Sequence, residues 1–575
     1  MKNFLVLSLV AFSSAIAEYE LHYPDMKMTG QKEINRPPEP VNSISQNKVI
    51  ITSVNGMIIA PESDRPGSYV IKTTKGVQNY RTMQGISIKK REALLKELDQ
   101  FVLGKPLTLK KIGEIKAKIS QFYQDNGHSL VIVNIPEQDV SDGVVVVTVL
   151  ESKLGKVEVI GNKWFTSERY LQNLSLEEDQ TIDTGALDAD IVYINESPWR
   201  RVSAVYKPGA QYGTTDIDLY VQDERPARLF VGADNTGFKV TGYNRLFVGF
   251  NWGHFLNYDH QLAFQYTASP DFHKFQAVTV YYSAPLPWRD EIDLFGGYSY
   301  VNVDRSSYIP TSNNKGSDWQ ASARYGIFIP PSGNFFQKAK FGLDVKQTNN
   351  DLTVANINYI ANSFASVAQL AGIYEASYKF GRNNFDFLGE GYVQPWDFGS
   401  TMSKKNYKAL RPNAVNKYLY IRMKGDYVWS DPKSGMMVTI KGRVQFSSGA
   451  LIPLESFGLG GENSVRGYVE RVVNVDNGGI LNLEFRTPFV SPSRNRINDR
   501  LAGIIFLDLG AGGILKSLSN QPSSYFLAGI GPGIRYDISS NLRARFDVGF
   551  RLTDAPFASS SKAEPQLYFG VIGSF

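Results

Sequence analysis

The chain has 575 residues, 20% of them charged, and a formal net charge of only +5. This small and mixed charge argues against nucleic acid as a partner, and the absence of cysteine excludes a disulfide scaffold, Cys-ligated zinc and a thiol nucleophile. Tyr, Phe and Gly are abundant, with 31, 34 and 50 residues respectively, and this composition suits β-rich structure, including outer-membrane barrels.

The N-terminal residues predict export from the cytoplasm. Lys2 supplies a positive charge, a short apolar stretch follows, and a small-x-small cleavage site ends at Ala17, so residues 1–17 are predicted to be a signal peptide. Residues 18–47 are polar and contain a Pro cluster at 36–40, which predicts a stiff, extended linker.

Two related α+β modules are predicted next, over residues 48–153 and 154–222. In the first module, apolar residues at three- and four-residue spacing predict a helix over 87–103 that ends at Gly104. Residues 60–85, before this helix, are interpreted as a long polar insert. The second module repeats the β-α-α-β-β order in a weaker form.

A second helix in the first module is predicted to begin after Thr108, which is a suitable capping residue. The apolar residues of this helix share one face, and they are Ile112, Ile115, Ile119 and Phe122. Such a face usually packs into the core of its own module. A groove between the helix and an edge strand could also accept an extended peptide by strand addition, so these residues are candidates for binding a partner.

From residue 227 to 575, segments of about ten residues alternate apolar and polar side chains, the pattern of a transmembrane β-barrel. Residues 436–446 and 542–551 show the alternation clearly. A soluble sandwich would place the apolar faces inward instead, and the alternation alone does not decide between the two. The predicted signal peptide, the many aromatic residues and the segment length favour a closed barrel of about sixteen antiparallel strands.

The last predicted strand, residues 566–575, ends on Phe575. A terminal aromatic residue after an amphipathic strand resembles the signal that bacterial barrel-assembly machinery recognises. This machinery is therefore an expected partner during biogenesis, and outer-membrane lipids are the expected surroundings of the barrel.

Several motifs resemble the TpsB transporters of two-partner secretion, within the outer-membrane superfamily that also contains the barrel-assembly insertases. Residues 103–108 resemble part of the family's first POTRA module, and residues 135–144 resemble its P-x-Q-d-x-x-x-G segment. With this resemblance, Pro136 and Gln138 join the candidate partner-binding residues.

Two further motifs of the superfamily are present. Val465-Arg466-Gly467-Tyr468 matches the VRGY motif of the long loop that folds back into the barrel, and Phe506-x-Asp508-x-Gly510 matches the F-x-D-x-G motif of a facing strand. The resemblance implies that a loop of about residues 449–477 enters the lumen, where irregular backbone is tolerated. We expect Arg466 and Asp508 to form a two-bond ion pair that pins the loop. The alternative is a solvated arginine and an unrelated lumen aspartate.

Enzyme, metal and cofactor functions are not predicted. The five histidines are scattered without zinc-binding spacing, and the sequence has no G-x-S-x-G motif, P-loop or dinucleotide fingerprint. Without a nucleotide site, transport would draw its energy from another process, such as folding of an exported chain outside the cell.

Three functions fit these patterns. The first is an export pore in the outer membrane of a Gram-negative bacterium, whose periplasmic modules capture an unfolded partner. The resemblance implies that this partner is a large secreted β-helical exoprotein. The second is a barrel-assembly insertase, which the presence of only two modules and the Pro-rich linker disfavour. The third is a passive porin, which does not need the predicted periplasmic modules.

Overall fold

The computed structural model describes residues 48–62, 75–238, 241–304, 312–349, 351–354, 357–360, 364–494, 496–519, 521–554 and 564–575. The predicted signal peptide over 1–17 and linker over 18–47 lie outside the described residues. The described residues form two compact units, one that ends at Glu224 and one that begins at Arg225. Within the described ranges, none of the helices is both long and apolar enough to cross a membrane.

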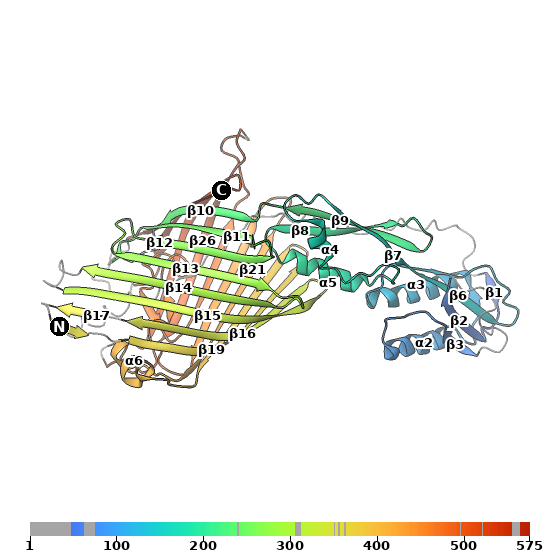
Figure 1. Ribbon diagram of the computed structural model, residues 1–575, viewed down its shortest axis with the longest axis horizontal. Coiled ribbons are helices and arrows are strands. Elements are labelled where there is room, and N and C mark those ends of the chain that lie inside the picture. Colours follow the sequence, from blue (N-terminus) through green and yellow to red (C-terminus); the bar gives the residue numbers. More distant parts are fainter. Residues whose placement is uncertain are drawn as a thin grey trace. The chain divides into compact units, whose positions relative to one another are not determined.

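The first module contains a four-stranded sheet with two helices packed on it (Figure 1). The sheet has the order β3-β2-β6-β5 and is accompanied by a short β1–β4 pair. The elements are β1 (Val49–Ile51), β2 (Gly56–Pro61), β3 (Gly76–Asn79), α2 (Ile88–Val102), β4 (Leu107–Thr108), α3 (Leu109–Asp125), β5 (Val131–Asn134) and β6 (Val144–Glu151).

The first helix of this module matches its predicted range closely, and the second begins directly after Thr108, as predicted. Thr108 caps α3 by accepting a hydrogen bond from the Lys111 backbone N–H at 3.2 Å. Gly104 follows α2 with a φ of 68°, a conformation in which glycine carries no Cβ penalty. Tyr123 of α3 is buried in the core, and its hydroxyl donates to Glu151 at 2.5 Å. Burial raises the pKa of Tyr123 well above its usual value.

The interpretation of residues 60–85 as a polar insert was incomplete. β3 lies inside this stretch and pairs in parallel with β2, Gly76 opposite Gly56. Only Val77 of this four-residue strand is buried, so its apolar signal is too short to detect by periodicity. The residues before this stretch form two strands, β1 and β2, and β1 pairs with β4 instead of joining the main sheet.

The second module is a three-stranded sheet of order β7-β9-β8 with two helices. Its elements are β7 (Lys153–Ile160), α4 (Ser167–Leu171), α5 (Thr184–Asn195), β8 (Arg200–Pro208) and β9 (Thr214–Asp223). Asp183 caps α5 through the Ala186 backbone N–H at 2.9 Å. Asp223 accepts hydrogen bonds from the backbone N–H groups of residues 163–165, which fixes the turn after β7.

Sixteen described strands form a closed antiparallel barrel, as predicted (Figure 1). They are β10 (Ala227–Asp234), β11 (Arg245–Phe255), β12 (His260–Ala268), β13 (Phe275–Pro285), β14 (Glu291–Asp304), β15 (Ser312–Ser332), β16 (Phe335–Asn349), β19 (Phe364–Phe380), β20 (Asn383–Gln394), β21 (Tyr418–Ser430), β22 (Met437–Ser447), β25 (Asn477–Arg486), β26 (Asp499–Gly513), β27 (Ser524–Ile538), β28 (Leu542–Arg551) and β29 (Gln566–Ser574). A hairpin of β17 (Asp351–Val354) and β18 (Ile357–Ile360) extends the wall beside the start of β15.

The direction of the side chains identifies a membrane barrel rather than a sandwich. Phe546 and Phe550 of β28 are exposed on the outer face, whereas Asp547 between them is 2% exposed. In the same way, Ile505 of β26 is exposed and Asp508 is fully buried. Apolar residues therefore cover the outside and charged residues line the inside, the arrangement of outer-membrane barrels.

The barrel closes between its first and last strands. β10 pairs with β29 from Phe230 opposite Ser574 to Asp234 opposite Gly570. Phe575 continues this pairing, because its backbone N–H and carbonyl exchange hydrogen bonds with Leu229 at 2.8 and 3.0 Å. The side chain of Phe575 is 71% exposed, so the terminal aromatic ring is available on the outside of the seam.

Candidate functional site

The connection between β22 and β25 is irregular and largely buried inside the barrel. It contains only a short hairpin, β23 (Phe457–Leu459) and β24 (Val473–Val475). Apolar residues of this connection form a cluster with wall residues, and the buried members are Leu459, Val465, Tyr468, Val473, Val475, Ile480, Ile514 and Leu527. We call residues 449–477 the inward loop, and its tip, residues 464–468, holds the VRGY motif.

Arg466 at the tip meets Asp508 of β26 in two parallel hydrogen bonds. Its Nε lies 2.7 Å from one carboxylate oxygen and its Nη2 lies 3.0 Å from the other. The Arg466 backbone N–H donates to the same carboxylate at 3.1 Å. The side chains of Arg466 and Asp508 are 6% and 0% exposed, so this pair is shielded from solvent, unlike a surface ion pair.

Further groups on the wall surround the same guanidinium. Its Nη1 lies 3.2 Å from Glu484 and 3.3 Å from Asp547, and its carbon lies 3.4 Å from the centre of the Phe506 ring. Arg535 lies 2.5 Å from Asp547 and therefore shares that carboxylate with Arg466. The tip is thus held by a network of charges from four strands, and the predicted pair is one part of it.

Glycines in the tip and in the wall let the tip backbone lie against the wall. A Cβ on Gly529 would lie 1.8 Å from the Arg466 carbonyl oxygen, and one on Gly549 would lie 2.4 Å from the Gly467 nitrogen. Gly467 itself has a φ of 101°, and a Cβ there would lie 2.8 Å from the backbone nitrogen of Arg551. At these distances even alanine would force the backbone apart.

The other motif residues also have specific contacts. The Tyr468 hydroxyl donates to the backbone carbonyl of Thr553 at 2.8 Å. The Tyr568 hydroxyl accepts from the Gly467 N–H at 2.9 Å and donates to the Tyr468 carbonyl at 2.6 Å. A Cβ on Gly510 would lie 2.7 Å from the Val465 side chain. The two predicted motifs are therefore brought together by the fold.

Several residues at the tip were not predicted as site residues. Asn482 donates to Asp508 at 2.8 Å and to the Ser464 carbonyl at 2.6 Å. Asn482, Glu484 and Asp547 belong to the polar faces of their strands, and in the closed barrel these faces line the lumen. Nothing in the alternation indicates which of the many lumen residues meet the loop, because that depends on how the loop folds.

The candidate partner-binding residues of the first module are mostly structural. Ile115 and Ile119 are fully buried in the module core, and Ile112 and Phe122 pack partly against it. The burial of Ile115 and Ile119 agrees with core packing, the usual role of such a face, because the face covers the module's own sheet, and their part in partner binding stays a prediction. Their positions at α3 satisfy the amphipathic pattern through core packing alone.

Gln138 and Pro136 also take part in the fold of the module. The Gln138 side-chain amide accepts from the Val146 N–H at 2.7 Å and donates to the Val146 carbonyl at 2.8 Å. It also donates to the Pro136 carbonyl at 3.2 Å. The amide of Gln138 thus replaces a strand partner beside β6, which is a structural reason for glutamine at this position.

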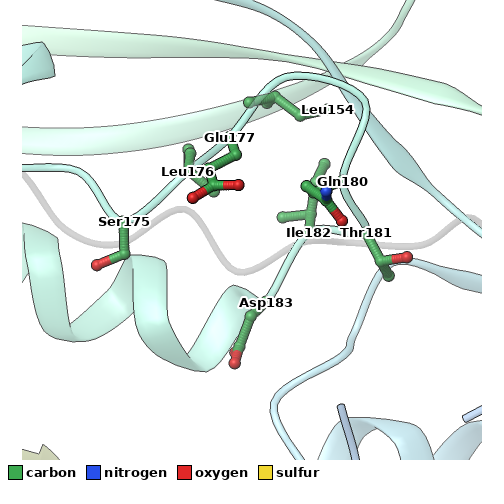
Figure 2. Close-up of a pocket in the computed structure, with 8 residues that line it drawn as sticks. All are labelled: Leu154, Ser175, Leu176, Glu177, Gln180, Thr181, Ile182 and Asp183. Carbon is green, nitrogen blue, oxygen red and sulfur yellow. The ribbon is translucent and has the colours of Figure 1, made fainter. Parts of the chain in front are cut away.

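A pocket of about 310 Å³ lies in the second module. Figure 2 shows that its lining comes from residues 175–183, before α5, together with Leu154 of β7. The backbone of this loop is tied to the start of β7, since the Leu154 N–H donates to Gln180 at 2.9 Å. The lining contains neither a histidine nor a basic side chain. Among the described residues, no group of three or more His, Asp or Glu side chains could hold a metal ion.

Comparison with known proteins is consistent with this architecture. Residues 213–536, more than half of the chain, match the family described as haemolysin secretion/activation protein ShlB/FhaC/HecB, and residues 77–152 match the ShlB-type POTRA domain. The heme/hemopexin transporter protein HuxB of Haemophilus influenzae (strain 86-028NP) is 21% identical over 452 residues, 76% of each chain. The outer membrane transporter CdiB of Escherichia coli is 25% identical over 460 residues, 73% of this chain and 69% of that relative.

Solved structures show the same fold. CdiB from Escherichia coli matches with a TM-score of 0.75 at 17% identity, covering 94% of this chain and 93% of the other. CdiB from Acinetobacter baumannii matches with a TM-score of 0.68 at 15% identity, covering 100% and 96%. The chain therefore belongs to the haemolysin secretion/activation family, the TpsB-type outer-membrane transporters of two-partner secretion, with its POTRA region in the periplasm.

Proposed function

We propose that this chain passes an unfolded, secreted β-helical exoprotein through its barrel and uses no nucleotide hydrolysis. The similar proteins HuxB and CdiB are both described as transporters. The observation that carries the proposal is the inward loop, held inside a closed barrel by the buried Arg466–Asp508 pair. A sixteen-stranded barrel can enclose an aqueous channel, so a loop that leaves its position would open one.

Capture of the exoprotein is assigned to the edges of the two periplasmic sheets. β3 and β5 are the edges of the first sheet, and β7 and β8 are the edges of the second. An extended chain can add to such an edge through backbone hydrogen bonds. Ile132 on β5 is 61% exposed, which offers an apolar contact beside one of these edges.

Insertion of the barrel itself is assigned to the barrel-assembly machinery, with Phe575 as part of the recognition signal. The exposed aromatic ring at the end of β29 supports this assignment. After insertion, the apolar outer face that includes Phe546 and Phe550 contacts the outer-membrane lipids.

The test of export uses a strain that produces this chain together with the exoprotein encoded by a neighbouring reading frame. We expect the exoprotein in the medium or on the cell surface only when the transporter is present. Equal amounts without the transporter would refute export. Purified protein in liposomes that inserts other unfolded barrel proteins, without exporting the exoprotein, would instead establish the insertase function.

A further inference from the structure

The inward loop has a second point of attachment, at its neck, where the chain enters and leaves the lumen. We define the neck as residues 450–455 and 473–476. Leu451, Glu455 and Asp476 of the neck are fully buried. None of these residues belongs to the VRGY or F-x-D-x-G motif, and none is among the contacts of Arg466 described above.

Asp476 joins several connections of the barrel at one carboxylate. Its two oxygens lie 2.6 and 2.7 Å from the Nη1 and Nη2 atoms of Arg411, a parallel two-bond pair. The same carboxylate accepts the backbone N–H of Leu451 at 2.8 Å and that of Leu515 at 2.7 Å. The four donors come from three different connections between strands, so Asp476 holds these connections together.

Arg411 belongs to the connection of residues 395–417, between β20 and β21. This connection contains the short helices η2 (Ser400–Met402) and α6 (Lys404–Leu410), and Figure 1 shows α6 at the same end of the barrel as β17. Because β10 starts from the periplasmic side and the strands alternate, this end is extracellular. We call residues 395–417 the cap loop.

The cap loop packs directly on the neck. Tyr407 and Leu410 of α6 belong to the same buried apolar cluster as Leu451 and Ile452. The Val415 N–H donates to the Ala450 carbonyl at 2.9 Å. Apolar contact, backbone hydrogen bonding and the Arg411 pair therefore all act between the cap loop and the neck.

The first arm of the neck, residues 450–455, is also fixed to the wall, through Glu455. Its carboxylate lies 2.9 Å from the Lys346 ammonium of β16 and also accepts a short hydrogen bond from Tyr420 of β21. Gln445 of β22 bridges the two arms, because its side-chain amide donates to the carbonyls of Glu455 at 3.3 Å and of Asp476 at 3.0 Å. The neck is thus held on both sides.

We propose that Arg411 and Asp476 are positioning residues for transport, and that the cap loop holds the neck as a second anchor that is independent of Arg466. The inward loop then clears the lumen only when the tip and the neck are both released. The transport consequence rests on the proposed function, whereas the anchoring itself concerns only this chain and can be measured without an exoprotein.

The experiment uses full-length protein with Arg411→Gln, which removes the charge and the two-bond geometry but keeps a polar side chain. Arg411→Lys keeps the charge without the two-bond geometry and is expected to give an intermediate effect. The matched control is Arg382→Gln, since Arg382 also pairs with an aspartate, Asp431 at 2.9 Å, but in a turn at the other end of the barrel. Heat-modifiable gel migration first confirms that each variant forms the barrel.

Two readouts follow in the folded variants. In the first, trypsin is added to intact cells, and its target sites are Lys404, Lys405 and Lys408, which are exposed on α6. We expect cleavage at these sites to become faster by about tenfold in Arg411→Gln. In planar bilayers of the purified protein, the fraction of time in a high-conductance state is expected to rise by a similar factor. Because independent anchors contribute additive free energies, combining Arg411→Gln with Arg466→Ala is expected to raise this fraction by about the product of the two single effects.

Cleavage and conductance equal to wild type in Arg411→Gln would overturn the proposal. Faster cleavage with unchanged conductance, alone and with Arg466→Ala, would also overturn it, because the cap loop would then be released without any effect on the neck. If the wild-type protein exports no exoprotein but these conductance effects appear, the proposed function fails and the second anchor stands.

Discussion

Arg466→Ala is the most direct test of how the tip is held. The substitution removes the two-bond pair with Asp508 and the contacts with Asp547 and Glu484. Loss of one partner from a fully buried pair costs about 3–5 kcal/mol, whereas an exposed pair is worth about 0–1 kcal/mol. Here Asp508 keeps its hydrogen bond from Asn482 and Asp547 keeps Arg535, which reduces the penalty.

We therefore expect a destabilisation of the docked tip by about 3 kcal/mol, which corresponds to roughly a hundredfold change in its occupancy. The absence of cysteine allows this to be measured with a single reporter, Ser464→Cys, because Ser464 lies in the tip and is 7% exposed. The rate at which a maleimide labels this position reports release of the tip. Arg500→Ala serves as the control on β26, since Arg500 is 44% exposed and pairs with Asp537 at 3.2 Å.

Asp508→Ala is expected to accelerate labelling by a similar factor. The double variant with Arg466→Ala is expected to fall well short of the sum of the two single free-energy changes, because both remove the same interaction. If the two free-energy changes simply add, the residues are not coupled and this account of the tip is wrong. Glu462 is unsuitable as a control, since it pairs with Arg545 at 2.7 Å and is itself 5% exposed.

Further predictions concern the tip contacts, the modules and the C-terminus. Gly529→Ala is expected to displace the tip, because its Cβ would lie 1.8 Å from the Arg466 carbonyl, while Gly442→Ala, with open space around it, is expected to label like the parent protein; equal labelling would contradict the close approach. Deletion of residues 48–153 is expected to abolish export while the barrel still shows a heat shift, and normal exoprotein yield would exclude capture by the first module. Phe575→Ala is expected to lower the amount of folded barrel in outer-membrane fractions, and unchanged amounts would remove its role as an assembly signal.

The barrel and the tip could be anticipated from the sequence for different reasons. Strand alternation is a local property, so residues such as Asp547 were assigned to the polar face of a strand without knowledge of the fold, and the predicted signal peptide, aromatic content and segment length then favoured a barrel with that face inside. Arg466 and Asp508 were paired through motif resemblance, since no local pattern joins residues 42 positions apart. Arg411 and Asp476 lie in irregular connections without any such motif, so only the folded structure brings them together.

The first module contains two features that the sequence alone did not settle, a helix face and a short strand. An amphipathic helix face indicates burial but not the surface that covers it, so Ile115 and Ile119 were assigned mainly to core packing, with partner binding as the alternative. In the structure the sheet of the same module covers that face, which agrees with core packing. β3 remained undetected since a four-residue strand with one buried side chain carries almost no periodic signal.

The inward loop also acts as a strut across the barrel. β16 and β28 are the seventh and fifteenth of the sixteen wall strands, eight strands apart and hence on opposite sides of the ring. Lys346 of β16 contacts the neck and Asp547 of β28 contacts the tip, so one loop links diametrically opposed walls. A barrel cross-section braced in this way resists flattening. Withdrawal of the loop would therefore make the wall more deformable at the same moment as it clears the lumen, which gives a passing chain a compliant rather than a rigid passage.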